Sequence, residues 1–346
     1  MKKILILMSI LALYAWAKPY TDMLGRVVDI KKNQTFVFIG PGALRLGVYL
    51  GLKNRVIGIE RIEQMKRKIN IQSPYRMYLG EKFTHSRPLI GNGGPGKMPN
   101  LEALVNVNPD VIFTSFIKKD QIEIIRQKTG IPVVALSYGS SYGGKGNKNL
   151  DEIKNSLYLI SQIAHVEERA KEIIDFIEFQ EKKLSKIKPS KKSLYVGGVA
   201  YKGIQPITST EVDYPPFVLL GQKNCVFENS TIKGHQFIDF EALLKANPEV
   251  IFTDMQSHDK ITQDYKKNKP MYETLQAYKN MDVKEVLGFN NYSTNVENLL
   301  VIAWQIATYL GESIDINKKA EDIYEVFYPK NGKVLLHKLE YNLGNV

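Results

Sequence analysis

Cysteine is almost absent from this chain: Cys225 is the only one among 346 residues. A single thiol excludes an internal disulfide framework and a cysteine-based zinc site. We also expect no lipid anchor at the amino terminus, because no cysteine stands there to carry one. Histidine is scarce too, with five in the chain and none in an HxH or HxxxH spacing. These shortages exclude disulfide-rich folds and the histidine pairs of metal hydrolases.

Long apolar runs are missing as well, except for one near the amino terminus. Two lysines precede an apolar run of eleven residues, 4–14, and the pattern Ala-Trp-Ala follows at 15–17. A basic start, an apolar run and a small-residue site are typical of a secretory signal peptide. We expect a signal peptide at 1–17, cleaved after Ala17, because the run is too short for the alternative, a membrane anchor. An exported chain with so little cysteine fits the bacterial periplasm.

Acidic residues are outnumbered, 36 against 47 lysines and arginines, which gives a net charge of +11. Removal of the signal peptide with its two lysines leaves +9. This excess favours anionic ligands or surfaces, but not nucleic acid, which an exported protein rarely meets. Enzyme signatures are missing too: there is no GxSxG elbow, no dinucleotide fingerprint and no carboxylate pair with an obvious task. An exported α/β enzyme is therefore the weaker alternative.

What the chain does contain is a stretch that occurs twice. NLEALVNVNPDVIFTS at 100–115 and DFEALLKANPEVIFTD at 239–254 are identical at nine of sixteen positions, with an offset of 139 residues. Asn100 and Asp239 are good helix N-caps, apolar residues follow at helical spacing, and Asn-Pro separates them from a β-rich run. Each copy predicts a short helix that leads directly into a buried strand. A duplication half a chain apart predicts two similar lobes.

Other β-rich runs alternate with helical segments on both sides of the repeat. Strands are predicted at 35–39, 56–59, 131–136, 193–199 and 283–287, and helices at 150–164, 166–187 and 295–310. This alternation predicts an α/β fold with two Rossmann-like lobes, each with a parallel central sheet, joined by one long rigid helix. We expect an N-terminal lobe at 18–150, a helical connector at 151–190 and a C-terminal lobe with the C-terminal helices at 191–346. Ligands gather at the carboxyl ends of such strands, where Gly42 and Ala43 could present backbone N–H groups to an anion.

Three further motifs are DMLGRVVDI at 22–30, GGVAYKG at 197–203 and TSTEVDYPPF at 208–217. Together with the signal peptide, the duplication and the connecting helix, they resemble the class III periplasmic binding proteins of the FecB, BtuF and CeuE type. Members of that family are the solute receptors of ABC importers for ferric siderophores, haem, vitamin B12 and, in some branches, molybdate or nickel complexes. The resemblance implies a monomer without a catalytic cofactor. Its implied partner is an inner-membrane ABC permease with a cytoplasmic ATPase.

The resemblance also implies two pairs of working positions. In family members the glutamate of each repeat forms a salt bridge with an arginine of the permease. Here these glutamates are Glu102 and Glu241, and the alternative is that they only favour the helix dipole. Six residues earlier, where family members point a side chain into the ligand cleft, this chain has Gly96 and His235. In siderophore receptors a histidine near this point and a later tyrosine complete the coordination of iron, which makes His235 and Tyr292 the candidate metal ligands.

Further candidates follow from the chemistry of the ligand. A bare metal ion needs three or four converging protein ligands, which the sequence does not show, whereas a metal inside a small chelator needs one or two. Such a complex also needs an aromatic, hydrogen-bonding cleft and cations to neutralise an anionic chelator. The aromatic candidates are Tyr138, Tyr201, Tyr214 and Tyr292, and the cationic candidates are Arg61, Arg87 and Lys202. We expect a ferric siderophore or nickel chelate as the ligand, with a molybdate or tungstate oxyanion as the alternative.

Overall fold

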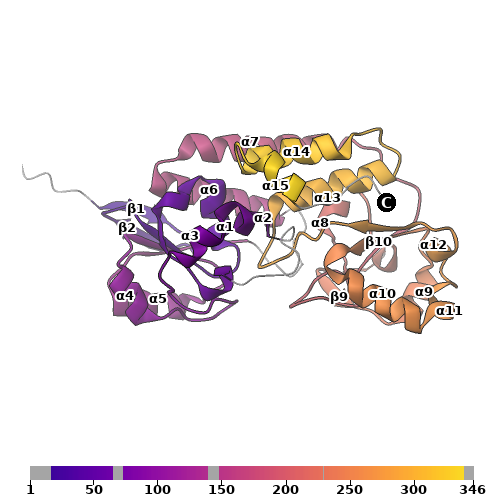
Figure 1. The fold of residues 1–346 in the computed structure, drawn as a ribbon, viewed down its shortest axis with the longest axis horizontal. Helices are drawn as coiled ribbons and strands as arrows, with labels where there is room; N and C mark the ends of the chain where they lie inside the picture. The colour runs from indigo at the N-terminus through magenta and orange to yellow at the C-terminus, as the bar shows by residue number, and fades with distance from the viewer. Residues whose placement is uncertain (1–16, 65–72, 139–147, 229, 339–346) are drawn as a thin grey trace, which may run out of the picture.

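The structure, a computed structural model, describes residues 17–64, 73–138, 148–228 and 230–338. Figure 1 shows two α/β lobes side by side, with long helices along one edge of the molecule. These helices are α7 (Glu167–Leu184), α13 (Val296–Tyr309) and α14 (Ile316–Phe327). Residues 1–16 of the predicted signal peptide lie outside the described residues. Within the ranges given above, no helix combines the length and the apolar character needed to cross a membrane.

The N-terminal lobe is built on a four-stranded parallel sheet with the order β4-β3-β5-β6. The strands are β3 (Phe36–Ile39), β4 (Val56–Gly58), β5 (Val111–Thr114) and β6 (Val133–Ala135), preceded by a hairpin of β1 (Lys18–Thr21) and β2 (Val27–Ile30). The helices are α1 (Ala43–Tyr49), α2 (Pro74–Leu79), α3 (Glu81–His85), α4 (Leu101–Val107) and α5 (Lys119–Thr129). The two central strands are buried along their whole length, as expected for parallel strands covered on both faces.

The C-terminal lobe repeats this plan with a three-stranded parallel sheet in the order β11-β10-β7. Its strands are β7 (Leu194–Gly197), β10 (Val250–Asp254) and β11 (Val283–Val286), and β8 (Ser209–Glu211) and β9 (His235–Phe237) form a separate antiparallel ribbon. Its helices are α8 (Pro215–Leu219), α9 (Phe240–Ala246), α10 (His258–Lys267), α11 (Lys269–Tyr272) and α12 (Gln276–Lys279). The predicted α/β class and the parallel sheet in each lobe are therefore confirmed.

The duplicated stretch folds as predicted in both lobes. Asn100 and Asp239 cap α4 and α9, because each side-chain oxygen accepts a hydrogen bond from the backbone N–H three residues later. Both helices end at an asparagine in the left-handed region, Asn108 with φ 48° and Asn247 with φ 40°. The strand that follows is flanked by a neighbour on each side, so each copy places its strand in the middle of a sheet.

The connector consists of two helices, α6 (Lys148–Ala164) and α7, and not of the one long helix expected between the lobes. The buried residues of α7 include Ala170, Ile173, Ile177 and Leu184, which lie at helical spacing and form one apolar face. Trp304 on α13 donates a hydrogen bond from Nε1 to Gln180 Oε1 on α7 at 2.9 Å. The connector is thus packed against a C-terminal helix and does not span the lobes alone.

The C-terminal helices also return to the N-terminal lobe, which the assignment of 191–346 to the other lobe did not anticipate. The ring of Phe327, at the end of α14, lies 4.7 Å from the ring of Tyr49 on α1. Tyr328 lies 6.0 Å from the same ring, and α15 (Gly332–Lys338) contacts α2. One apolar core therefore runs through both lobes and the helices between them.

A buried polar contact joins the lobes a second time. Arg45 on α1 is fully buried and donates hydrogen bonds to the carbonyl oxygens of Thr294 at 2.8 Å and Asn291 at 2.7 Å, both in the loop after β11. Next to it, the buried carboxylate of Glu297 accepts hydrogen bonds from the hydroxyls of Tyr49 and Tyr328. These contacts fix the loop after β11 to the N-terminal lobe and limit the rotation between the lobes.

Candidate ligand-binding site

The turn after β3 does not leave the backbone N–H of Ala43 free, as its sequence had suggested. Ala43 is buried, and its N–H already donates to Gly40 O at 3.2 Å. Gly42 has φ 78°, and a Cβ built on it would lie 2.4 Å from the ring of Tyr138. The Tyr138 hydroxyl donates to the Gly42 carbonyl. Glycine is needed here because the tyrosine ring packs directly on the backbone, so Gly42 and Ala43 belong to the packing of the turn.

Two of the four candidate tyrosines lie in the interior. Tyr138 is 1% exposed and Tyr214 is 2% exposed, so neither presents a ring face to a ligand. Tyr214 packs edge-on against Phe217, with 5.2 Å between the ring centres. Burial raises the pKa of both phenols above their usual value. The sequence marked these residues as hydrogen-bonding aromatics but could not show that they are buried.

Tyr292 lies between the lobes, and its hydroxyl is engaged on the N-terminal side. It donates to Glu60 Oε2 at 2.8 Å and accepts from Gly94 N–H at 2.9 Å. Glu60 also accepts from Gly40 N–H at 3.0 Å. Burial raises the pKa of Glu60 to about 7, against the opposing effect of the Tyr292 hydrogen bond. In this arrangement Tyr292 is a contact between the lobes, and coordination of a metal would require its bond to Glu60 to break.

Arg61 lines a cavity of about 570 Å³ at the edge of the N-terminal lobe. The lining residues are Arg61, Leu89, Gly91, Asn92, Gly93, Lys97, Met98, Pro99 and Asn100. The polar side chains of this lining are the cations Arg61 and Lys97 and the amides Asn92 and Asn100, and the lining contains no carboxylate. A Cβ built on Gly93 would lie 3.0 Å from Tyr292 Oη, so the cavity adjoins the contact between the lobes. The cavity suits an anionic group.

Gly96 is exposed beside this cavity, with φ 67°. Its N–H donates to Phe116 O at 2.9 Å, and the nearest atom to a Cβ built on it would be 3.9 Å away. Arg87 has a different role: its Nε donates to Val56 O at 2.8 Å, and its guanidinium lies 4.6 Å from the ring centre of Phe83. There is therefore open space at Gly96, whereas the Arg87 side chain is engaged in contacts within the N-terminal lobe.

The half-buried His235 is the best-defined candidate, and it lies on the β8–β9 ribbon. Its ring stacks on Tyr201 with the ring centres 4.2 Å apart and the planes inclined by 9°, and Phe237 meets it edge-on at 4.8 Å. The exposed Lys202 places Nζ 5.2 Å from the centre of the Tyr201 ring. Figure 1 shows β9 on the side of the C-terminal lobe that is nearest to the N-terminal lobe.

The hydrogen bonds around His235 determine its tautomer. Ser209 Oγ donates its one proton to Val199 O at 2.7 Å, so it can only accept from His235 Nε2, also at 2.7 Å. Nε2 therefore carries the proton, and Nδ1 keeps its lone pair. No described residue makes a hydrogen bond to Nδ1. Burial lowers the pKa of His235 to about 4, which keeps the ring neutral and able to bind a metal.

Sequence reasoning missed two residues next to His235. Ser209, described above, fixes the imidazole. Glu211 lies opposite His235 in the ribbon and is 6% exposed, and burial, with Asp213 nearby, raises its pKa to about 8. The alternation of Ser209 and Glu211 within TSTEVDYPPF is a strand signal that could have shown both on one face. The pairing with His235 joins distant parts of the chain, and no local pattern reveals it.

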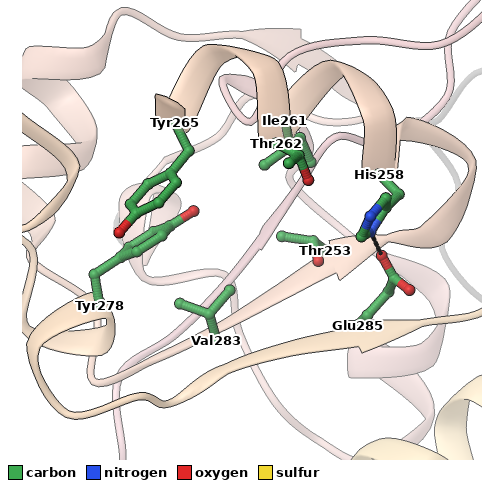
Figure 2. A pocket seen from close by; sticks show the side chains of 8 residues that line it. All are labelled: Thr253, His258, Ile261, Thr262, Tyr265, Tyr278, Val283 and Glu285. Atoms are coloured by element: carbon green, nitrogen blue, oxygen red, sulfur yellow. Dashed lines mark hydrogen bonds and ion pairs between the residues drawn. The ribbon is translucent and has the colours of Figure 1, made fainter. Parts of the chain in front are cut away.

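A second histidine and glutamate border a separate cavity of about 320 Å³ on the C-terminal lobe (Figure 2). There His258 Nδ1 lies 2.7 Å from Glu285 Oε1, and Tyr265 and Tyr278 stack at the other end with ring centres 5.5 Å apart. The imidazole nitrogen is thus already paired, unlike Nδ1 of His235. In the part of the chain that the structure describes, no group of three His, Cys, Asp or Glu side chains could hold a metal ion.

Glu102 and Glu241 occupy the first turns of α4 and α9. Both side chains are exposed, and neither forms an ion pair with a described residue. Their equivalent positions in the duplicated unit give each lobe one carboxylate that is accessible to a partner.

Comparison with known proteins identifies the family. The sequence model of the periplasmic binding protein family matches residues 80–286, more than half of the chain. The chain belongs to this family. The periplasmic binding protein is 24% identical over 330 residues to the molybdate-binding protein MolA of Haemophilus influenzae, covering 89% of this chain and 90% of MolA. The resemblance to ABC importer receptors of the FecB and BtuF type is confirmed.

Solved structures support the same fold for this periplasmic binding protein. MolA bound to molybdate superimposes with a TM-score of 0.65 at 19% identity, covering 90% of this chain and 98% of MolA. A periplasmic solute binding protein from Veillonella parvula gives 0.67 at 17% identity and covers 95% and 94%. The iron-uptake system-binding protein FeuA of Bacillus subtilis gives 0.59 at 18% identity and covers 85% and 100%. MolA binds molybdate whereas FeuA belongs to an iron-uptake system, so the fold alone does not identify the ligand.

Proposed function

We propose that this periplasmic binding protein receives a transition-metal complex, a ferric siderophore or a nickel chelate, between its lobes and delivers it to an ABC permease. The observation that carries the proposal is the free lone pair of His235 Nδ1. The opposite nitrogen donates to Ser209, an arrangement that orients metal-binding histidines in general. The neutral ring packs against Tyr201 and Phe237, whose apolar surfaces suit an organic chelator.

The other residues support a complex rather than a bare ion. Among the described residues no three His, Cys, Asp or Glu side chains converge, and we propose that the chelator fills most of the coordination positions. Arg61 and Lys97, in the cavity beside the contact between the lobes, provide cations for the anionic groups of such a chelator. In this proposal Tyr292 keeps its hydrogen bond to Glu60, so it forms part of the wall between the lobes and does not coordinate the metal.

A molybdate or tungstate oxyanion is the second candidate. It is supported by the similarity to MolA and by the cavity at Arg61 and Lys97, whose lining contains no carboxylate. An oxyanion would take hydrogen bonds from these cations and amides and would have no use for the lone pair of His235. The two candidates therefore predict opposite effects of removing that side chain.

Isothermal titration calorimetry with a ferric catecholate, a nickel–histidine complex and sodium molybdate tests these candidates. We expect one of the metal complexes to bind and His235→Ala to weaken that binding on the order of 100-fold, while His258→Ala, the matched control, changes it less than about twofold. Tight molybdate binding that is unaffected by His235→Ala would replace the first candidate with the second. Mass spectrometry of protein purified natively from periplasm identifies the bound species independently.

For delivery, we propose that Glu102 and Glu241 form the two contacts with the permease, one from each lobe. Their exposure and their lack of ion pairs with described residues support this role. We further propose that the receptor acts as a monomer in the periplasm after cleavage behind Ala17. Amino-terminal sequencing and size-exclusion chromatography of the exported protein test these two points, which would be contradicted by an uncleaved or dimeric species.

A further inference from the structure

The β8–β9 ribbon has two chemically different faces. Ser209 and Glu211 alternate along β8, and His235 and Phe237 alternate along β9, in the register Ser209↔Phe237 and Glu211↔His235. Because side chains alternate across a strand, these four lie on one face. The hydrogen bond that His235 Nε2 donates to Ser209 Oγ confirms that they share it. Thr210 lies on the other face and donates to Val196 O in the central sheet at 2.6 Å.

The register brings Glu211 and His235 close together. Val212 N–H donates to Gly234 O at 3.0 Å, and Ile238 N–H donates to Thr208 O at 3.0 Å, so the hydrogen-bonded pairs are the ones on either side of Glu211↔His235. A pair of the non-hydrogen-bonded type has its Cβ atoms about 4.5–5.5 Å apart. The carboxyl group and the imidazole therefore project side by side from neighbouring strands.

Both side chains have polar atoms without partners among the described residues. The carboxyl oxygens of Glu211 make no hydrogen bond there, although the side chain is more than nine-tenths buried; only its backbone carbonyl is used, by Asn224 at 3.0 Å. Nδ1 of His235 is likewise unpartnered. The Glu211 carboxyl oxygens are not among the fully buried atoms that lack a partner, so this largely buried group still reaches the surface and is accessible to a ligand.

We propose that Glu211 coordinates the metal of the bound complex together with His235: the carboxyl group releases its proton to water on binding, and the carboxylate and Nδ1 take two adjacent positions on one metal ion. This inference rests on the proposed function, and it adds that the C-terminal lobe recognises the metal ion of the complex. A complex whose chelator leaves two neighbouring positions open, or exchanges two of its donors readily, is the class that fits. Nitrogen and carboxylate oxygen together suit iron and nickel. Ser209 is the positioning residue, because it fixes the tautomer of the imidazole.

The wild-type protein provides the first test through two nickel probes. Nickel nitrilotriacetate leaves two adjacent octahedral positions open, whereas nickel ethylenediaminetetraacetate occupies them with the chelator. We expect calorimetry to detect binding of the first probe and at least about tenfold weaker binding of the second, and X-ray absorption to show one added imidazole nitrogen in the bound complex. Equal affinity for both probes would overturn the proposal, because it would show recognition of the chelator without coordination.

Variants then separate the two side chains. We expect Glu211→Gln to weaken binding of nickel nitrilotriacetate on the order of 10- to 100-fold and His235→Ala to weaken it at least as much, with circular dichroism confirming that both fold. Glu285→Gln, at the other histidine–glutamate pair, is the matched control and should change affinity less than about twofold. If Glu211→Gln binds with unchanged affinity while His235→Ala loses affinity, Glu211 is not a metal ligand, and the proposed role of His235 stands. Unchanged affinity in both variants would overturn the proposed metal ligand as well.

Discussion

Replacement of Arg45 by methionine tests whether the buried contact between the two lobes stabilises the fold. The guanidinium donates to the carbonyls of Asn291 at 2.7 Å, Thr294 at 2.8 Å and Tyr292 at 3.2 Å, all in the loop after β11. Methionine has a similar length and no donor, so the substitution removes these bonds without leaving a large cavity. We expect the loop to lose its attachment to the N-terminal lobe and the protein to lose stability.

The magnitude follows from the burial of these groups. A hydrogen bond from a charged donor contributes about 1.5–3 kcal/mol, and the carbonyls left behind cannot all reach water. The substitution also removes the cost of burying a charged guanidinium, which offsets part of this loss of stability. In addition, the buried Glu297 loses a nearby cation. We therefore expect a net loss of about 3–5 kcal/mol, the range found when one partner of a buried charged pair is removed. This is a large part of the 5–15 kcal/mol typical of a folded domain.

Urea unfolding of the chain without residues 1–17 measures this loss. Trp304 is then the only tryptophan, and its fluorescence can be compared with far-UV circular dichroism. Arg126→Met is the control, because Arg126 is 53% exposed and its ion pair with Glu123 should contribute less than about 1 kcal/mol. A loss below about 1 kcal/mol for Arg45→Met would refute the role of the contact. Separate transitions for the two probes in the wild type would show that the lobes unfold independently.

Three further predictions concern affinity, transport and pH. Ser209→Ala should weaken binding of the metal complex on the order of 10- to 100-fold, because the proton of His235 is then no longer held on Nε2, and circular dichroism should show an unchanged fold; equal affinity would show that the hydrogen bond does not orient the ring. Glu102→Ala combined with Glu241→Ala should abolish uptake in cells but leave affinity unchanged, and lost affinity would contradict a docking role. Glu60 has a pKa of about 7 in the fold against 4.5 unfolded, so its contribution favours the fold below pH 4.5 and is lost as the pH rises to 7, a difference of about 3 kcal/mol. Glu60→Gln should flatten that part of the stability profile in urea titrations.

Local signals in the sequence predicted the fold well. The N-cap, the apolar spacing and the Asn-Pro sequence of each repeat are contained within a few residues, and the structure confirms the capping by Asn100 and Asp239. The long helices were found because α7 keeps its apolar face over five turns of uninterrupted sequence. The packing of Phe327 and Tyr328 on Tyr49 was missed, because it depends on where the chain returns after α14.

The site was predicted less completely for the same reason. His235 was found through its place before the second repeat, but the atoms that define its chemistry come from Ser209 on a different strand. Tyr138 and Tyr214 have the right side chains for a ligand cleft and are nevertheless buried, a distinction that depends on tertiary packing. Glu211 was overlooked because an isolated glutamate in a sequence is far more often a surface residue than a buried one.

The asymmetry between Gly96 and His235 suggests a last prediction: a histidine at position 96 should not replace the one at 235. In the C-terminal lobe the imidazole depends on a paired strand, on Ser209 as the acceptor and on Glu211 as its neighbour. The described segment 91–100 before α4 forms no strand, and Gly96 has φ 67°, which strains any residue with a Cβ. We therefore expect Gly96→His in a His235→Ala background to bind nickel nitrilotriacetate no better than His235→Ala alone. Restored affinity would show that a histidine anywhere around the cleft is sufficient, and that the ribbon is not what selects the metal.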